Sequence, residues 1–164
     1  MNRDLPPGAD QGEARQPIPA GLAFDPARVT KMLTRYGHGG WLGMRYHGHG
    51  EDWVELALPW REELVGVAAT GVLASGPIIS LMDNATSLSV WTRRGTFTPQ
   101  VTVDLRVDYV RAAVPGRTVI GRGECYKLTR NIAFVRGVAY DQHLEDPVAH
   151  VVGTFMTLDG AAAG

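Results

Sequence analysis

Residues 75–93, SGPIISLMDNATSLSVWTR, decide the fold, because they read as one long helix that is apolar on more than one side. Gly76-Pro77 suits a helix start, and Arg93-Arg94-Gly95 suits a helix end, where cations and a glycine are favoured. Apolar residues recur around it: Ile78, Leu81, Met82, Ala85 and Leu88 on one stripe, with Ile79, Val90 and Trp91 on other sides. This pattern predicts a buried central helix.

The residues after this helix predict antiparallel strands. In 101–110, apolar and polar residues alternate over a long stretch, which is typical of a half-buried strand. Further strands are expected at 118–128, 132–141 and 148–158, joined by turns at 114–117, 129–131 and 146–147.

The residues before the helix predict one shorter helix and two strands. Asp25-Pro26 suits a helix start, and Gly37 suits its end. Strands are expected at 41–49 and 53–59, followed by a loop at 61–70. Helices and strands do not alternate regularly, so the sequence predicts an α+β fold whose antiparallel sheet curls around the central helix.

The chain has 164 residues and a formal net charge of −1. Residues 1–22 hold several prolines and few large apolar side chains, which predicts a disordered leader before a single domain at 23–160. The balanced charge argues against a nucleic-acid partner bound through overall charge. No apolar run approaches the roughly 20 residues of a membrane helix, and no signal peptide is apparent. We therefore expect a cytoplasmic protein without a membrane partner.

Metal and disulfide chemistry are not expected. The single cysteine, Cys125, excludes an internal disulfide and a multi-cysteine zinc site. His47 and His49 point to one side of a predicted strand, but they lie in a glycine-rich hairpin without a third ligand. The motifs of the hydrolase elbow, the P-loop and the Rossmann fold are absent.

Asp83 is the main candidate for chemistry, because it falls in the middle of the apolar helix. A carboxylate there is costly unless it is paired, hydrogen-bonded or used as a general base. The structural alternatives are a bond to the hydroxyl of Thr86 or Ser87, or a capping role in a helix that starts later. Ser87 shares the face of Asp83 and is a candidate for positioning a water, although such a serine often bonds a helical carbonyl.

Ser75 and Gly76 form the second candidate site, since free backbone N–H groups at a helix start can hold an oxyanion. Ser75 and Asp83 are eight residues apart, which is about 12 Å along one helix and too far for both to act on one carbonyl. They converge only where two copies of the helix lie antiparallel. A functional Asp83 therefore implies a dimer with paired sites.

Residues 70–91, TGVLASGPIISLMDNATSLSVW, and 102–118, TVDLRVDYVRAAVPGRT, resemble the PaaI-like group of hotdog-fold acyl-CoA thioesterases, within the 4-hydroxybenzoyl-CoA thioesterase superfamily. The GTFM of residues 153–156 fits the same pattern. The resemblance covers roughly residues 40–158. It implies a hotdog fold, with a curved antiparallel sheet wrapped around a long central helix, and a homodimer or homotetramer.

The resemblance also implies hydrolysis of an acyl-CoA thioester to a free acid and CoA. Asp83 would be the base or nucleophile, and the start of the partner's helix at Ser75 and Gly76 would supply the backbone N–H to the carbonyl. Thr102, with Ser87, would assist. Three basic residues are candidates for binding the CoA phosphates: Arg111, Lys127 and Arg130. No metal or redox cofactor is implied.

Two positions depart from the family pattern. Ala74 stands where the family has the His of an HGG motif, and Ala68 stands where it has an Asn. By analogy with oxyanion donors, each lost side chain costs about 10²-fold or more in rate. These alanines favour an alternative function, a non-catalytic protein that binds acyl-CoA or an aromatic ligand. A dehydratase or hydratase is a third function on this fold, but no Asp/His pair in one motif supports it.

Overall fold

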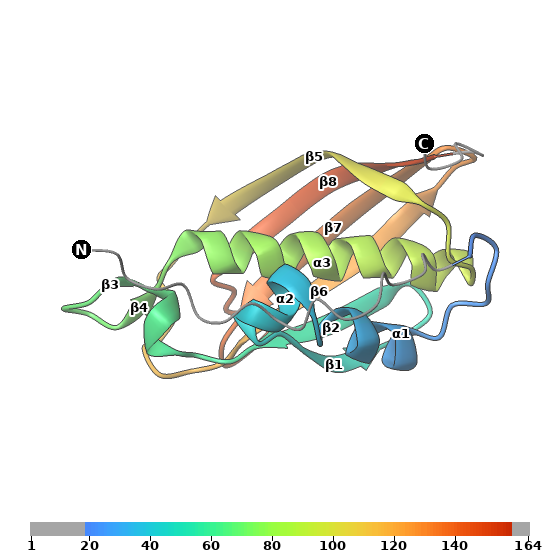
Figure 1. Cartoon of the computed structure of the whole chain (residues 1–164). Helices are drawn as coiled ribbons and strands as arrows, with labels where there is room; N and C mark the ends of the chain where they lie inside the picture. The colour runs from blue at the N-terminus through green and yellow to red at the C-terminus, as the bar shows by residue number, and fades with distance from the viewer. Residues whose placement is uncertain (1–18, 159–164) are drawn as a thin grey trace, which may run out of the picture.

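The computed structural model describes residues 19–158 and confirms the α+β class (Figure 1). Its elements are α1 (Pro26–Leu33), α2 (Gly37–Leu42), β1 (Arg45–His49), β2 (Trp53–Leu58), the 3-10 turn η1 (Glu62–Leu64), β3 (Val65–Val67), β4 (Val72–Leu73), α3 (Ser75–Arg94), β5 (Gln100–Tyr109), β6 (Val119–Leu128), β7 (Ile132–Tyr140) and β8 (Ala149–Thr157). The central helix and the four strands after it end within one residue of their predicted bounds. Within residues 19–158, no helix has both the length and the apolar character needed to cross a membrane.

Six strands form one antiparallel sheet in the order β1-β2-β6-β7-β8-β5. β5 follows α3 in the chain but pairs only with β8, so it takes one edge of the sheet. Figure 1 shows α3 lying lengthwise against the curved sheet, with α1 and α2 on the side of β1 and β2. This is the hotdog arrangement.

The helix α3 packs directly on β6, because β6 has glycines where the helix passes. A Cβ atom at Gly121 would lie 2.7 Å from Cγ of Leu81, and one at Gly123 would lie 2.5 Å from the backbone carbonyl carbon of Ala85. Leu81 and Ala85 are both 0% exposed. Larger residues on β6 would therefore push the helix away from the sheet.

The segment before the sheet differs from the expectation. The strand predicted at 41–49 was wrong in its first half, since the chain forms α2 there and the strand begins only at Arg45. Gly37, which was expected to end the first helix, instead begins α2. Glycine has a low helix propensity, so the glycine-rich sequence of α2 does not predict a helix. Gly40 is nevertheless required, because a Cβ atom there would lie 2.7 Å from the backbone of Arg35.

The loop predicted at 61–70 was wrong, because it contains η1, β3 and the turn that leads to β4. Most of the predicted leader 1–22, together with the last two residues of the predicted domain 23–160, lies outside the described residues. In the described part of that leader, Gly21 N–H donates to the Phe97 carbonyl and Leu22 carbonyl accepts from Phe97 N–H, both at 2.8 Å.

Replacing Gly123 by Ala should destabilise the fold by about 2 kcal/mol, since the new methyl group would overlap the backbone of α3. Gly48→Ala is the matched control, because its Cβ atom would meet its nearest neighbour at an ordinary 3.5 Å. The control should change the free energy of unfolding by less than about 0.5 kcal/mol. Urea unfolding of both variants measures the difference, and equal stabilities would contradict a tight contact between α3 and β6.

Candidate active site

The start of α3 is exposed and carries backbone N–H groups without helical partners. Ala74 precedes the helix in an extended conformation, and no side chain in the described part of the chain caps the helix there. Ser75 and Gly76 are both exposed, whereas Pro77 has no N–H to offer. The first N–H groups of a helix also carry the positive end of its dipole. This is the helix end to which the sequence analysis assigned a carbonyl oxygen.

Asp83 lies half-buried near the middle of α3 and contacts β5. The Thr102 hydroxyl donates a hydrogen bond to Asp83 Oδ1 at 2.9 Å, so two of the predicted site residues are in direct contact. Within residues 19–158, Asp83 Oδ2 has no hydrogen-bond partner. The Thr86 hydroxyl donates to the carbonyls of Met82 and Asp83 rather than to the carboxylate. One carboxylate oxygen is therefore held, and the other is available.

Ser87 also contacts β5, one turn after Asp83. Gln100 Nε2 donates to both the hydroxyl and the carbonyl oxygen of Ser87, each at 2.9 Å. Gln100 is not among the predicted site residues, although its position two residues before Thr102 puts both on one face of a strand. Two polar side chains of α3, Asp83 and Ser87, are thus paired with polar side chains of β5.

A groove of about 350 Å³ opens beside the start of α3. It is lined by residues of α2, of the η1–β3 region and of α3: His38, Trp41, Leu42, Glu63, Leu64, Val65, Ala74, Gly76, Pro77 and Ser80. His38 Nε2 lies 3.1 Å from Ser80 Oγ. The sequence analysis singled out neither residue, because they are 42 positions apart and α2 was not foreseen.

A second groove, of about 360 Å³, also reaches the start of α3 and is lined in part by Ser75, Ile78 and Tyr109. The Tyr109 hydroxyl donates to the Ser75 carbonyl at 2.9 Å. Burial raises the pKa of Tyr109, so this phenol keeps its proton at neutral pH. The end of β5 therefore holds the first turn of α3 through a hydrogen bond.

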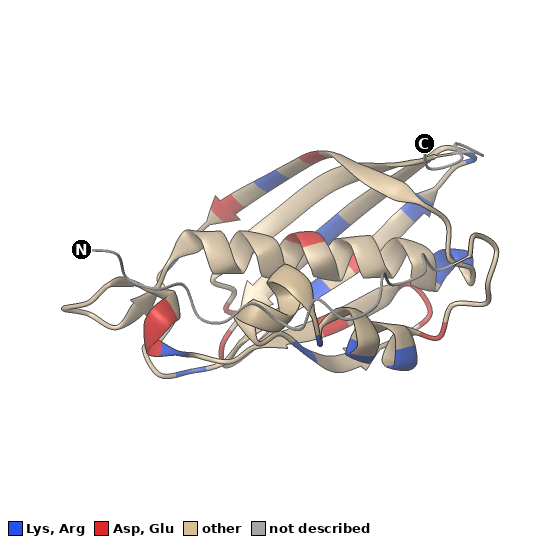
Figure 2. Cartoon of the chain, viewed as in Figure 1, with Lys and Arg blue, Asp and Glu red and all other residues tan. Residues whose placement is uncertain are grey.

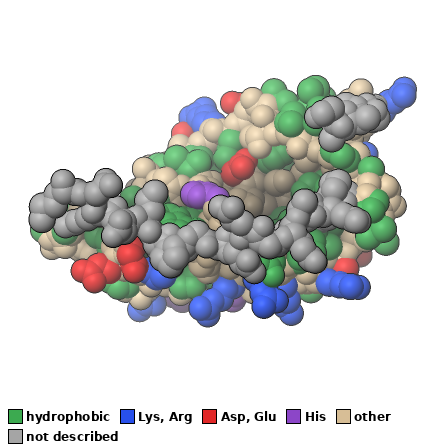
Figure 3. Space-filling view, in the orientation of Figure 1, with side chains coloured by type: hydrophobic (Ala, Val, Ile, Leu, Met, Phe, Trp, Pro, Cys, Tyr) green, Lys and Arg blue, Asp and Glu red, His purple; other side chains and the backbone are tan. Residues whose placement is uncertain are grey.

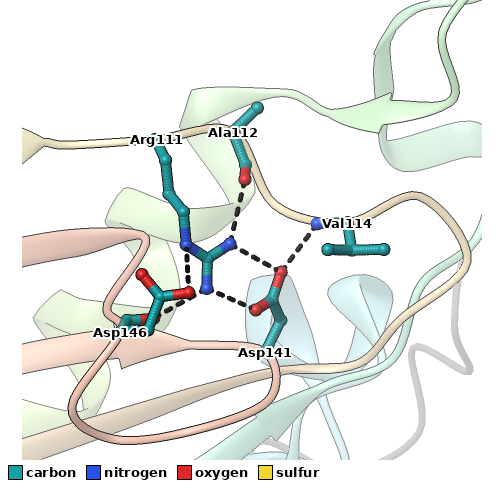
Figure 4. A network of polar contacts seen from close by, with 5 residues as sticks. All are labelled: Arg111, Ala112, Val114, Asp141 and Asp146. Atoms are coloured by element: carbon teal, nitrogen blue, oxygen red, sulfur yellow. Dashed lines mark hydrogen bonds and ion pairs between the residues drawn. The ribbon is translucent and has the colours of Figure 1, made fainter.

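Arg111, a predicted phosphate-binding residue, is held in a network of its own (Figure 4). Its guanidinium donates to both carboxylate oxygens of Asp141, at 2.6 and 3.1 Å, and lies 3.2 Å from the Asp146 carboxylate. The Asp141 side chain has no exposed surface and accepts a further bond from Val114 N–H at 2.6 Å. Hydrogen bonds from Arg111 hold the pKa of Asp141 below its ordinary value, and Asp141 raises the pKa of Arg111. The carboxylates of Asp141 and Asp146 thus neutralise the charge of Arg111 within the fold.

The other two phosphate candidates, Lys127 and Arg130, are exposed at the end of β6 and in the turn before β7. The sequence analysis missed a basic groove of about 310 Å³ whose lining includes Lys31, Arg35 and Arg45. None of these three cations forms an ion pair with a carboxylate in the described chain. Figure 2 shows basic residues in blue along α1 and β1 at this side of the molecule.

The remaining candidates from the sequence are not among the residues that line these grooves. Cys125 is buried, and burial raises the pKa of its thiol. His49 Nδ1 lies 2.6 Å from the Tyr46 hydroxyl. Among residues 19–158, no group of three or more histidine, cysteine or acidic side chains is placed to hold a metal ion.

Replacing Asp141 by Asn should cost about 3 kcal/mol of stability at pH 7, because it leaves the Arg111 charge without its main partner. The pKa of Asp141 is lowered on folding, so its contribution is present above the ordinary value of 3.8 and is lost as the pH falls below it. The difference in urea unfolding between wild type and variant should therefore be full at pH 7 and should shrink as the pH falls below 3.8. A constant difference across this range would contradict the assignment.

Comparison with known proteins points to one family. The model of the thioesterase superfamily matches residues 70–147. A solved protein from Pseudomonas aeruginosa is 34% identical with a TM-score of 0.74, and the alignment covers 82% of this chain and 100% of that chain. The phenylacetic acid degradation protein PaaI from Thermus thermophilus is 26% identical with a TM-score of 0.63, covering 73% and 96%. A thioesterase from Haemophilus influenzae, 20% identical with a TM-score of 0.74 over 87% and 96%, shares the fold. A search of curated proteins found no match.

The matched region and the site coincide. Residues 70–147 include the start of α3 and the contacting pair Asp83 and Thr102. The 34% identity extends over the full length of the Pseudomonas protein, so the likeness is not confined to the central helix. By sequence and by its hotdog fold, this chain belongs to the thioesterase superfamily.

Proposed function

We propose that this protein hydrolyses acyl-CoA thioesters to a free acid and CoA, with Asp83 as the base or nucleophile. The carboxylate itself carries the proposal, because Asp83 is half-buried, one of its oxygens is held by Thr102, and the other is available. A carboxylate positioned in this way can take a proton from water. Membership in the thioesterase superfamily supports a thioester as the substrate.

The proposed site needs two copies of the chain, since Ser75 and Asp83 are about 12 Å apart along one helix. Ile79 lies midway between Ser75 and Asp83 on α3. If two α3 helices pack antiparallel with the twofold axis close to Ile79, Asp83 of one copy lies beside Ser75 of the other. A twofold contact places the same residue of both copies at the axis. Ile79 is apolar and 41% exposed in the single chain, which suits that position.

The edge strand β5 supports the same dimer. It is 10 residues long and is paired on one side only within the described chain. Its residues Val101, Val103 and Tyr109 are 40, 58 and 42% exposed. A long unpaired strand edge that carries exposed apolar side chains favours pairing with another chain. Figure 3 shows hydrophobic side chains in green along the upper edge of the molecule, where Figure 1 places β5. A homotetramer built from two such dimers would keep the same sites.

In the proposed mechanism, the thioester carbonyl oxygen accepts hydrogen bonds from Ser75 and Gly76 N–H of one copy. The partner's Asp83 takes a proton from water as the water oxygen bonds to the thioester carbon. The helix start stabilises the negative charge that develops on the carbonyl oxygen. The C–S bond then breaks, and the departing CoA sulfur takes up the proton from Asp83.

The CoA phosphates require cations that are exposed to solvent. Lys127 and Arg130 are exposed and keep this proposed role. Arg111 does not suit it, because it is paired with Asp141 and Asp146.

Asp83→Asn should lower kcat for free-CoA release by about 10²-fold or more, since the base is lost. Thr102→Val, which removes only the bond that holds the base, should lower it by about tenfold. Glu51→Gln changes an exposed acid in the turn between β1 and β2 and should leave kcat unchanged. The assay uses a panel of short, long and aromatic acyl-CoAs. A folded wild type that melts at a higher temperature with acyl-CoA but releases no CoA would be a binding protein instead.

Ser75→Pro should lower kcat by about 10²-fold, because it deletes one N–H from the proposed oxyanion site. Proline is tolerated at the first helical position, and Ala74 already has the extended conformation that precedes proline. Ser75→Ala keeps the N–H and should stay close to wild type.

The same variants test whether the site is shared between copies. Co-expression of the Ser75→Pro and Asp83→Asn chains should restore about a quarter of wild-type activity, because half of randomly paired dimers keep one intact site of two. Adding Ile79→Asp to both chains should abolish the dimer and the recovery. A mixed dimer that stays inactive would contradict the shared site.

A further inference from the structure

The groove beside the start of α3 contains an imidazole that the proposed mechanism leaves unused. His38 Nε2 lies 3.1 Å from Ser80 Oγ. Ser80 is about one helical turn after Gly76, and both line the groove together with His38. The His38 imidazole therefore lies beside the first two turns of α3, where the thioester carbonyl is proposed to bind.

The helix α2 holds this imidazole in place. Leu42, at the end of α2, is 1% exposed and anchors the helix in the core. The Arg61 guanidinium donates a hydrogen bond to the Trp41 carbonyl. The Trp41 ring stacks on the His38 ring, with centroids 6.2 Å apart and planes 16° apart. His38 is thus a positioned side chain at the groove, although it belongs to a short helix.

The His38–Ser80 pair keeps one hydrogen-bond donor in either tautomer. When Nε2–H donates to the serine oxygen, the serine O–H remains; when the serine O–H donates to Nε2, Nδ1–H remains. Within residues 19–158, neither side chain makes another hydrogen bond. Glu63 is the other ionisable residue that lines this groove in the described chain, and an ionised carboxylate cannot donate.

We propose that the His38–Ser80 pair donates a hydrogen bond to the thioester carbonyl oxygen, beside the N–H groups of Ser75 and Gly76. This inference rests on the proposed function. The pair transfers no proton: its bond to the oxygen strengthens as water adds to the carbonyl carbon and weakens again when the C–S bond breaks. The imidazole of this pair comes from α2, outside the residues 70–147 that the family model matches, whereas Ser80 lies within them.

Steady-state kinetics test the role in catalysis. His38→Ala should lower kcat by about 10²-fold, as the loss of an oxyanion donor does elsewhere, and should change KM much less. His38→Gln, whose amide N–H has a similar reach, should recover about tenfold of that loss. His47→Ala removes an exposed histidine on β1 and should match wild type. The melting temperature of each variant confirms that it is folded.

Binding of two CoA analogues tests the hydrogen bond without turnover. In the first, the ketone analogue of hexanoyl-CoA, a methylene replaces the sulfur and the carbonyl is kept. The second, S-hexyl-CoA, has no carbonyl. His38→Ala should weaken calorimetric binding of the ketone by about tenfold and leave binding of S-hexyl-CoA unchanged.

The outcomes separate this inference from the proposed function. A wild type that releases no CoA but shows the His38-dependent preference for the ketone would overturn hydrolysis and support the hydrogen bond. A His38→Ala variant that equals wild type in kcat and ketone affinity, or that weakens both analogues equally, would overturn the hydrogen bond alone. A wild type that neither hydrolyses acyl-CoA nor binds either analogue would overturn both.

Discussion

The close contact between α3 and β6 is the constraint on which the rest of the structure depends. Gly121 and Gly123 place no side chain between helix and strand, so the face of α3 that carries Leu81 and Ala85 is pressed against the sheet. This contact fixes the rotation of the helix about its own axis. Asp83 then lies half-buried on another face of the helix, where it accepts a hydrogen bond from Thr102 of β5. A carboxylate in the middle of an apolar helix is tolerated for this reason.

The parts of the fold that could be predicted are those with a long, regular pattern. α3 and the strands β5 to β8 each repeat their apolar residues over at least nine positions, so periodicity located them closely. α2 is six residues long, and three of these are glycine, which gives neither a repeat nor a favourable helix propensity. β3 and β4 have only three and two residues, too few to show an alternation.

The candidate site also has parts that the sequence predicts and parts that only the tertiary structure shows. Asp83 stood out in the sequence because a carboxylate is unusual in that helix, and Thr102 was suggested by the family resemblance. Their contact is a product of tertiary structure, as is the pairing of Arg111 with Asp141 across 30 residues. The sequence shows that Arg111 is basic, but not that the fold has already balanced its charge. His38 was missed because its partner lies on another element, which no spacing rule connects with α2.

The end of β5 links two places that are far apart in the chain. The Tyr109 hydroxyl donates a hydrogen bond to the first turn of α3. Two residues later, Arg111 forms ion pairs with Asp141 and Asp146 in the loop between β7 and β8. That loop is thereby connected to the helix end that is proposed to bind the carbonyl. Changes of length or charge in the loop at 141–148 can therefore shift the position of the start of α3. They do so without replacing any residue of the proposed site.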